Sequence, residues 1–99
     1  MSRKKRVDIN QNAIAQCLKA AGLSVAYTHM VGQGFPDIIV GYKGLNFLFE
    51  IKNPEQSPSK RKLTEDEETF HKSWRGNVHI IEYAEDAIKI IKKGKIPCK

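Results

Sequence analysis

The hydrophobic and polar positions of the N-terminal third follow a helical period. Apolar residues recur three and four positions apart after position 13, at Ile14, Cys17, Leu18 and Ala21. Gly22 then supplies a stop signal, so we expect a first helix over 9–21. Asp8 is the expected N-cap of this helix, with Gln11 three residues later completing a capping-box pattern.

The middle of the chain is rich in β-branched and aromatic residues and predicts strands over 23–28, 36–42 and 45–52. Lys43-Gly44 separates the last two and predicts a β-hairpin with a short turn. Gly32 and Gly34 mark the preceding segment as an irregular loop, where glycine permits an unusual turn or a close approach of the backbone.

The C-terminal half begins with 53–62, which is rich in Pro, Ser and basic residues and reads as an exposed loop. Thr64 to Glu67 forms a second capping-box pattern, which opens a helix that ends at Gly76 and places Phe70 and Trp74 in the core. A buried strand over 78–83 and a last helix over 84–93 complete the order α-β-β-β-α-β-α.

The length of 99 residues predicts one domain, over 8–99. The basic residues of the segment 1–7 indicate a flexible arm before it. The net charge of +6 favours a polyanionic partner, with nucleic acid the commonest candidate, although a merely soluble basic surface explains it too. Cys17 and Cys98 form no close pair, which argues against a disulfide framework and fits a reduced, cytoplasmic setting. No apolar segment of signal-peptide or membrane-spanning character is present, so no membrane partner is expected.

Three charged residues meet if Lys43-Gly44 is a two-residue turn. In that register Asp37 lies directly opposite Glu50, and opposed residues point to the same face of the sheet. Lys52, two residues beyond Glu50, shares that face. Taken singly, each residue is also explained as an ordinary strand or turn charge, and a longer turn would offset Asp37 from Glu50.

Two opposed carboxylates repel each other, and a divalent cation would relieve the repulsion. Carboxylate and carbonyl oxygens with waters suit Mg²⁺, which can polarise a phosphodiester and acidify a bound water. A neighbouring ammonium, here that of Lys52, can orient that water or stabilise the developing negative charge. The hairpin therefore indicates a metal-dependent phosphodiester hydrolase.

The spacing of Pro36-Asp37 and Glu50-Ile51-Lys52 resembles the PD-(D/E)xK nuclease signature. The run from Gly34 to Gly41 is similar to the VRR-NUC branch and its small phage relatives, and the similarity continues through Leu63-Thr64, His71 and 74–76. The resemblance implies an α/β, restriction-endonuclease-like core with a mixed four-stranded sheet flanked by helices.

The resemblance also implies a mechanism and partners. Asp37, Glu50 and the carbonyl of Ile51 would bind Mg²⁺, with Mn²⁺ able to substitute, and Lys52 would assist the attacking water. Small members of the branch resemble Holliday-junction resolvases that act as homodimers on branched DNA. Because the chain is too short for an added sequence-reading domain, we expect recognition of a DNA structure such as a four-way junction.

The sequence departs from the family pattern at two positions. An acid usual on the first helix is replaced by Ala13, with Gln11 or Asn12 as substitutes that point elsewhere on the helix, and Glu67 stands where a Gln is usual. Both changes argue against a second metal site, whereas a one-metal mechanism remains compatible with them. They also leave open that the chain is a DNA-binding module with impaired catalysis. A sequence-specific nicking or restriction-type enzyme is a further alternative. Glu67 is equally well explained as a helix cap or as an accessory site residue.

Basic residues outside the hairpin are the candidates for DNA contacts that position the backbone without reading sequence. They form two groups, one in the N-terminal arm and one in the exposed loop: Arg3, Lys4, Lys5 and Arg6, then Lys60, Arg61 and Lys62. His71 is a further candidate for a phosphate contact, and an ordinary surface histidine explains it as well.

Overall fold

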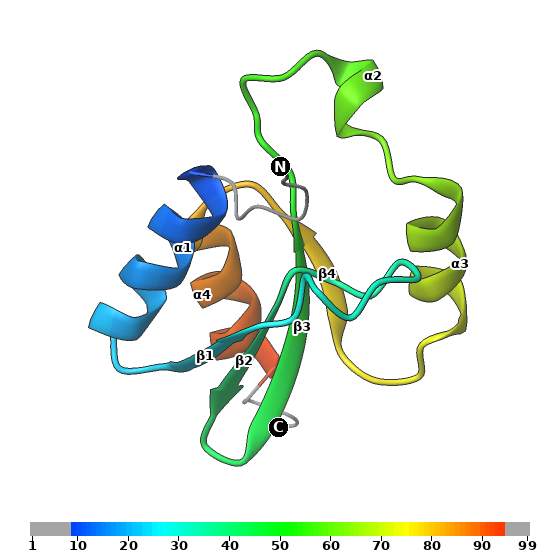
Figure 1. Ribbon diagram of the computed structural model, residues 1–99. Coiled ribbons are helices and arrows are strands. Elements are labelled where there is room, and N and C mark those ends of the chain that lie inside the picture. The colour runs from blue at the N-terminus through cyan, green and yellow to red at the C-terminus, as the bar shows by residue number, and fades with distance from the viewer. Residues whose placement is uncertain (1–8, 95–99) are drawn as a thin grey trace.

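Four strands form one sheet in the computed structural model, which describes residues 9–94 (Figure 1). The strands are β1 (Ser24–Tyr27), β2 (Ile38–Tyr42), β3 (Leu45–Ile51) and β4 (Val78–Ile81), in the order β1-β2-β3-β4. β1, β2 and β3 pair antiparallel, whereas β4 runs parallel to β3. The mixed sheet with flanking helices confirms the predicted α/β class in these terms.

Helices cover the sheet from two sides. α1 (Ile9–Ala20) and α4 (Ala84–Gly94) lie together on one side, and α3 (Glu65–Ser73) lies on the other (Figure 1). A one-turn helix, α2 (Pro58–Arg61), stands beyond the end of β3 in the long connection to α3. The parallel pairing of β3 and β4 requires such a crossover.

The hydrophobic core lies between the sheet and the α1–α4 layer. Side chains alternate along a strand, so Phe47, Phe49 and Ile51 of β3 enter this core while Leu48 and Glu50 point to the opposite face. α1 contributes Ile14 and Leu18 to the same cluster. The face of the sheet toward α3 therefore remains available for polar side chains.

The β2–β3 hairpin has the predicted register within the two strands, whereas the predicted pair of Asp37 with Glu50 lies one position beyond the observed ladder. Tyr42 pairs with Leu45, and the pairs continue outward to Ile38 with Phe49. Lys43 and Gly44 both have positive φ, 49° and 82°, as the tight turns of two-residue hairpins require. The turn thus fixes which residues share each face.

The segment 53–62 is not the continuous loop that was expected, because α2 lies within it. Pro58 begins the helix at a position where proline costs no hydrogen bond, and Ser57 is its N-cap residue. The observed order is therefore α-β-β-β-α-α-β-α.

Some apolar positions are more exposed than the sequence pattern indicated. Cys17 and Ala21 are exposed, because α1 buries the face that carries Gln11, Ile14 and Leu18. β4 ends at Ile81 and forms an edge of the sheet, which leaves Ile80 48% exposed.

Trp74 is 44% exposed rather than in the core. Trp74 follows α3 as its C-cap residue and stacks on Phe70 at a centroid distance of 4.9 Å. The Phe70 ring therefore covers only part of the indole.

No helix within residues 9–94 is long and apolar enough to cross a bilayer. The expected N-cap Asp8, the arm 1–7 and Cys98 lie outside the described residues.

Candidate functional site

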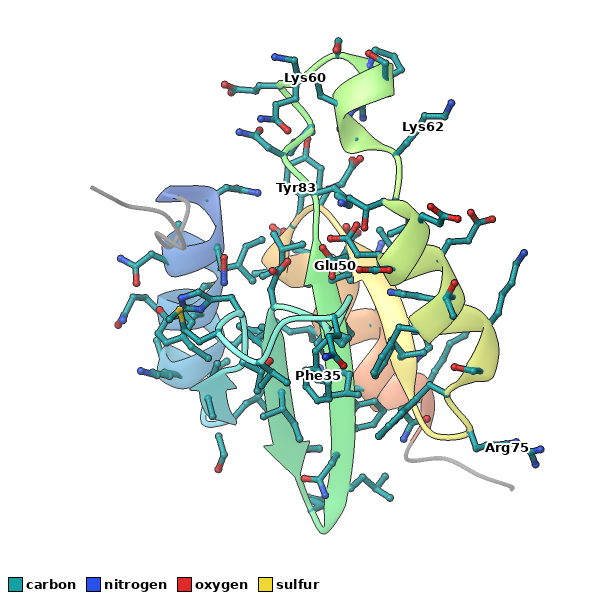
Figure 2. The ribbon with its side chains drawn as sticks, turned by 45° about the vertical axis from the view of Figure 1, so that its right-hand side comes forward. Phe35, Glu50, Lys60, Lys62, Arg75 and Tyr83 are labelled. Atoms are coloured by element: carbon teal, nitrogen blue, oxygen red, sulfur yellow. The ribbon has the colours of Figure 1, made fainter. Side chains whose placement is uncertain are left out.

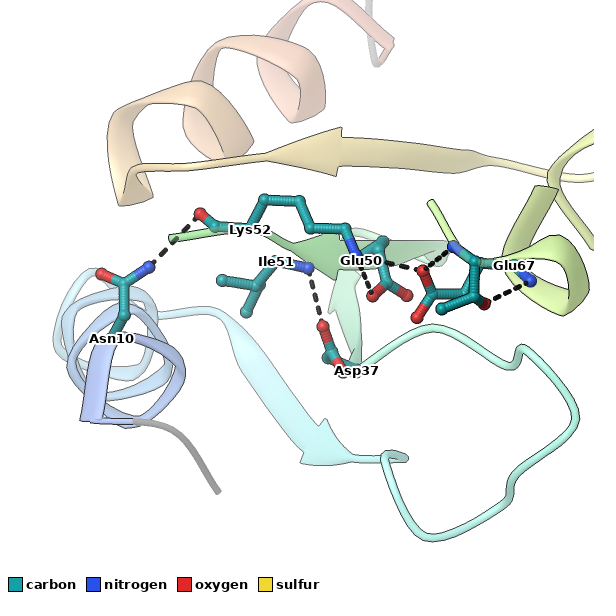
Figure 3. A network of polar contacts seen from close by, with 7 residues as sticks. Asn10, Asp37, Glu50, Ile51, Lys52 and Glu67 are labelled. Atoms are coloured by element: carbon teal, nitrogen blue, oxygen red, sulfur yellow. Dashed lines mark hydrogen bonds and ion pairs between the residues drawn. The ribbon is translucent and has the colours of Figure 1, made fainter. Parts of the chain in front are cut away.

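Asp37 stands immediately before β2 and ties that strand to the end of β3. Its backbone N–H donates to the carbonyl of Phe49 at 3.0 Å. One carboxylate oxygen, Oδ2, accepts the backbone N–H of Ile51 at 2.8 Å (Figure 3). The acid is therefore held against the residue that lies between Glu50 and Lys52.

Glu50 is a buried acid, only 3% exposed, on the face of β3 that α3 covers. Its Oε2 lies 3.6 Å from the Nζ of Lys52. Its other oxygen, Oε1, is buried and has no hydrogen-bond partner among residues 9–94. A buried carboxylate oxygen without a partner is costly, so this position calls for a proton or a cation.

Glu67 brings the third carboxylate to the group from α3. Its Oε1 accepts the backbone N–H of Thr64 at 3.0 Å and also lies 3.0 Å from the Nζ of Lys52 (Figure 3). The hydroxyl of Thr64 in turn accepts the N–H of Glu67. Glu67 therefore both caps α3 and contacts Lys52, so the two roles that the sequence left open for it occur together.

The charges of the group are unbalanced, since three acids surround one ammonium. Burial raises the pKa of Glu50 to about 9, and the nearby charges of Asp37 and Glu67 push it in the same direction. Burial also raises the pKa of Asp37, against the lowering effect of the Ile51 hydrogen bond.

Lys52 and Glu67 stabilise each other's charged form. Burial alone would lower the pKa of Lys52, but the hydrogen bond to Glu67 and the surrounding acids raise it overall. Burial would raise the pKa of Glu67, but the Thr64 N–H and the ammonium of Lys52 lower it overall. The group is therefore a charged Lys–Glu pair beside two acids that resist ionisation.

A cavity of about 390 Å³ opens beside these acids, lined by Asp37 and Glu67 together with Gln11 and the loop 32–35. Gln11 is 5% exposed, and its side-chain nitrogen has no hydrogen-bond partner in the part of the chain that the structure describes. The expectation that Gln11 points away from the site was wrong, because the buried face of α1 begins with it. Ala13, on the opposite side of the helix, is exposed.

His29 also lines the cavity, and its buried Nδ1 has no hydrogen-bond partner within the described residues. Sequence reasoning gave His29 no role because it lacks the spacing of a metal ligand. The only available signal was its place next to the glycine-rich loop.

The residues predicted to contact DNA lie in different surroundings. Lys60 and Lys62 are exposed near α2 and extend away from the sheet (Figure 2). Arg61 instead makes an ion pair with Glu82 at 3.0 Å. His71 is half-buried on α3, with an unpartnered Nε2 and a pKa lowered by burial. Arg3, Lys4, Lys5 and Arg6 lie outside the described residues.

Asp37 and Glu50 are the residues of the group that could hold a divalent cation. Within residues 9–94 no three His, Cys, Asp or Glu side chains are grouped as metal ligands. Mg²⁺, however, retains several waters and commonly takes one or two protein carboxylates. The unpartnered oxygen of Glu50, with Asp37 raised in pKa beside it, supplies hard oxygen atoms whose repulsion a cation would relieve.

Comparison of the chain with protein-family models, with curated proteins and with solved structures gives no match.

Proposed function

We propose that this chain is a magnesium-dependent DNA endonuclease of the PD-(D/E)xK type, close to the VRR-NUC branch, with a restriction-endonuclease-like core. The observation that carries the proposal is the convergence of Asp37, Glu50 and Lys52 at the end of the β2–β3 hairpin opposite its turn, with a buried Glu50 oxygen that has no hydrogen-bond partner among residues 9–94. The antiparallel hairpin, the parallel β4 and the flanking helices support the fold assignment.

In this proposal Asp37, Glu50 and the carbonyl of Ile51 would hold Mg²⁺ or Mn²⁺. The bound ion would supply Lewis acidity toward the phosphodiester and its water. Lys52 orients the attacking water and stabilises negative charge on the phosphate oxygens. Glu67 positions Lys52 through the 3.0 Å contact between its Oε1 and the Nζ of Lys52. This ion pair explains why position 67 can carry an acid where a Gln is usual.

The net charge of +6 supports a polyanionic substrate. We propose branched DNA cut by a homodimer, in which Lys60 and Lys62 contact phosphates beside the site. Cutting that follows sequence rather than branching would favour the nicking or restriction-type alternative.

A DNA-binding module with impaired catalysis is the second candidate. It is favoured by Gln11, because α1 presents a neutral amide to the cavity and not an acid. This candidate predicts salt-sensitive DNA binding without metal-stimulated cleavage.

The test is incubation of the full chain with linear, nicked, forked and four-way DNA, in Mg²⁺ and then in chelator. We expect cuts that require the metal and that disappear in Asp37→Ala. Glu68→Gln is the matched control, since Glu68 is an exposed acid of the same helix as Glu67 and forms an ion pair with Lys72, away from the group. Unchanged cutting by Asp37→Ala would overturn the site assignment.

A further inference from the structure

The loop between β1 and β2 carries two apolar side chains in water. Met30 is 67% exposed and Val31 is 61% exposed, more than any other large hydrophobic side chain within residues 9–94. Exposed apolar groups at a loop tip contribute nothing to the core, so their place on the molecule is the feature to explain.

We propose that Met30 and Val31 form a wedge that enters the base stack of DNA bound at the candidate site. This inference rests on the proposed function, to which it adds the way in which the substrate is deformed and positioned.

The base of the loop is fastened to Asp37. Thr28 donates its backbone N–H to the carbonyl of Asp37 at 2.8 Å and its hydroxyl to the carbonyl of Pro36 at 2.8 Å. Within the loop, the N–H of Val31 donates to the carbonyl of Thr28 at 3.1 Å. The base of the loop is therefore connected by one short hydrogen bond to Asp37, the residue that would hold the metal, and by a second to its neighbour Pro36.

The far side of the loop lies directly against the backbone of α3. Gly32, Gln33 and Gly34 all have positive φ, 83°, 56° and 81°. A Cβ on Gly34 would lie 2.3 Å from the carbonyl oxygen of Asp66, so backbone meets backbone at this point. A non-glycine residue in this conformation persists only where its surroundings impose it. The loop thus presents its tip in a defined conformation.

The tip lies at the rim of the cavity. His29 and Gly32 flank Met30 and Val31 in the chain, and both line the same cavity as Asp37 and Glu67. The segment 28–36 contains no Lys, Arg, Asp or Glu. It is therefore suited to apolar contact with bases, and phosphate contacts must come from elsewhere.

Apolar side chains inserted between base pairs unstack them and kink the duplex, and methionine is among the residues that do so. A rigid tip beside the reacting phosphate would place one base step in a fixed position relative to Asp37. A second copy of this chain is the other occupant that could cover the tip, and the test separates the two.

The experiment uses forked and four-way DNA with 2-aminopurine placed at successive steps around the branch, in chelator so that no cutting occurs. The wild-type chain is expected to raise 2-aminopurine emission at one step by unstacking it. The double variant Met30→Ser with Val31→Ser should lose this increase while its DNA affinity changes by less than roughly threefold, because phosphate contacts dominate affinity. Leu45→Ser is the matched control, because Leu45 is exposed beside the hairpin turn and away from the cavity.

The outcomes separate the wedge from the nuclease. Metal-dependent cutting by the wild-type chain with no emission change at any step would overturn the wedge and leave the nuclease standing. An emission increase that the double variant loses, without cutting in any metal, would support the wedge and overturn the nuclease. A dimer that the double variant converts to a monomer in light scattering, with emission unaltered, would assign the tip to a second copy and overturn the wedge.

Discussion

Glu50 is the residue at which stability and proposed function conflict most directly. Its carboxylate is buried, one oxygen lacks a partner, and Lys52 is shared with Glu67. Buried polar groups of this kind destabilise a fold unless something compensates them. A cation between Glu50 and Asp37 would provide that compensation, so the cost has a functional explanation.

Replacement of Glu50 by Gln should therefore stabilise the metal-free protein at alkaline pH. The pKa of Glu50 rises from 4.5 to about 9 on folding, so the folded wild-type chain binds more protons than the unfolded chain between those values. Wild-type stability then falls as pH rises through this range, whereas a glutamine does not titrate. Urea denaturation in chelator should show equal free energies of unfolding near pH 4 and an advantage for Glu50→Gln of roughly 1–3 kcal/mol near pH 9. A constant difference across this range would contradict the assignment.

Asp37 has a structural role, as the acceptor of the Ile51 N–H, and a proposed role as a metal ligand. The substitutions Asp37→Asn and Asp37→Ala distinguish the two roles. Its carboxylate accepts the N–H of Ile51 at 2.8 Å, and an asparagine oxygen can do the same. Asp37→Asn should keep the free energy of unfolding within about 1 kcal/mol of wild type, and Asp37→Ala should lose about 1–3 kcal/mol by leaving the Ile51 N–H without its partner. Both should abolish cutting in a nuclease assay. Full activity in Asp37→Asn would show that its charge has no part in the reaction.

At the scale of elements, the hairpin is the part of the site that the sequence determines most completely. Lys43 and Gly44 fit a two-residue turn, and that turn sets the register up to the pair of Ile38 with Phe49. Asp37 follows directly beyond this pair, where its hydrogen bonds to Phe49 and Ile51 hold it at the end of β3. Local turn chemistry was sufficient here because both strands lie within a few residues of it.

Contacts between distant elements were harder to predict. The apolar residues of the first helix allow more than one buried face, and only packing against the sheet shows that Gln11 is turned inward and Cys17 outward. Similarly, the capping box places Glu67 correctly on α3, but its contact with Lys52 depends on the position of α3 over β3. The exposure of Ile80 depends on the strand order, because β4 is an edge strand.

The attachment of the glycine-rich loop to α3 can be tested with two neighbouring glycines. Gly34→Ala would place a Cβ 2.3 Å from the Asp66 carbonyl oxygen, whereas Gly32→Ala meets nothing within 4 Å at nearly the same φ. We expect Gly32→Ala to lower the free energy of unfolding by about 1 kcal/mol through backbone strain alone. Gly34→Ala should cost roughly 2–4 kcal/mol because the loop must also move away from α3. Equal losses in thermal or urea unfolding would mean that the loop is not held there.

At the scale of the whole molecule, the sheet separates two environments. α1 and α4 seal an apolar core on one side, and α3 lies on the other (Figure 1). Lys52 contacts Glu67 of α3, and the cavity is lined by residues of α3, of the loop before β2 and by Gln11 of α1. Lys60 and Lys62 extend from the α2 end of the molecule (Figure 2). A polyanion is therefore expected to bind on the α3 side, with these lysines near one end of its path.

Binding of DNA on the α3 side predicts that substitutions in two pairs of lysines will affect DNA affinity differently. Lys60→Gln with Lys62→Gln should weaken DNA binding and reduce the slope of log affinity against log salt by roughly two. Lys89→Gln with Lys93→Gln removes the same charge from the exposed side of α4 and should leave the slope nearly unchanged. Fluorescence anisotropy over a salt series measures both. Equal effects of the two pairs would mean that binding follows net charge alone.

The most direct measurement is the binding of Mn²⁺, which is paramagnetic and can replace Mg²⁺ in oxygen-ligand sites. Titration followed by electron paramagnetic resonance should show a bound ion in the wild-type chain and in the control Glu68→Gln. Asp37→Asn and Glu50→Gln should each weaken that binding by at least about tenfold, since each removes one of the two charged ligands. Wild-type affinity for Mn²⁺ in both variants would contradict a shared cation between Asp37 and Glu50.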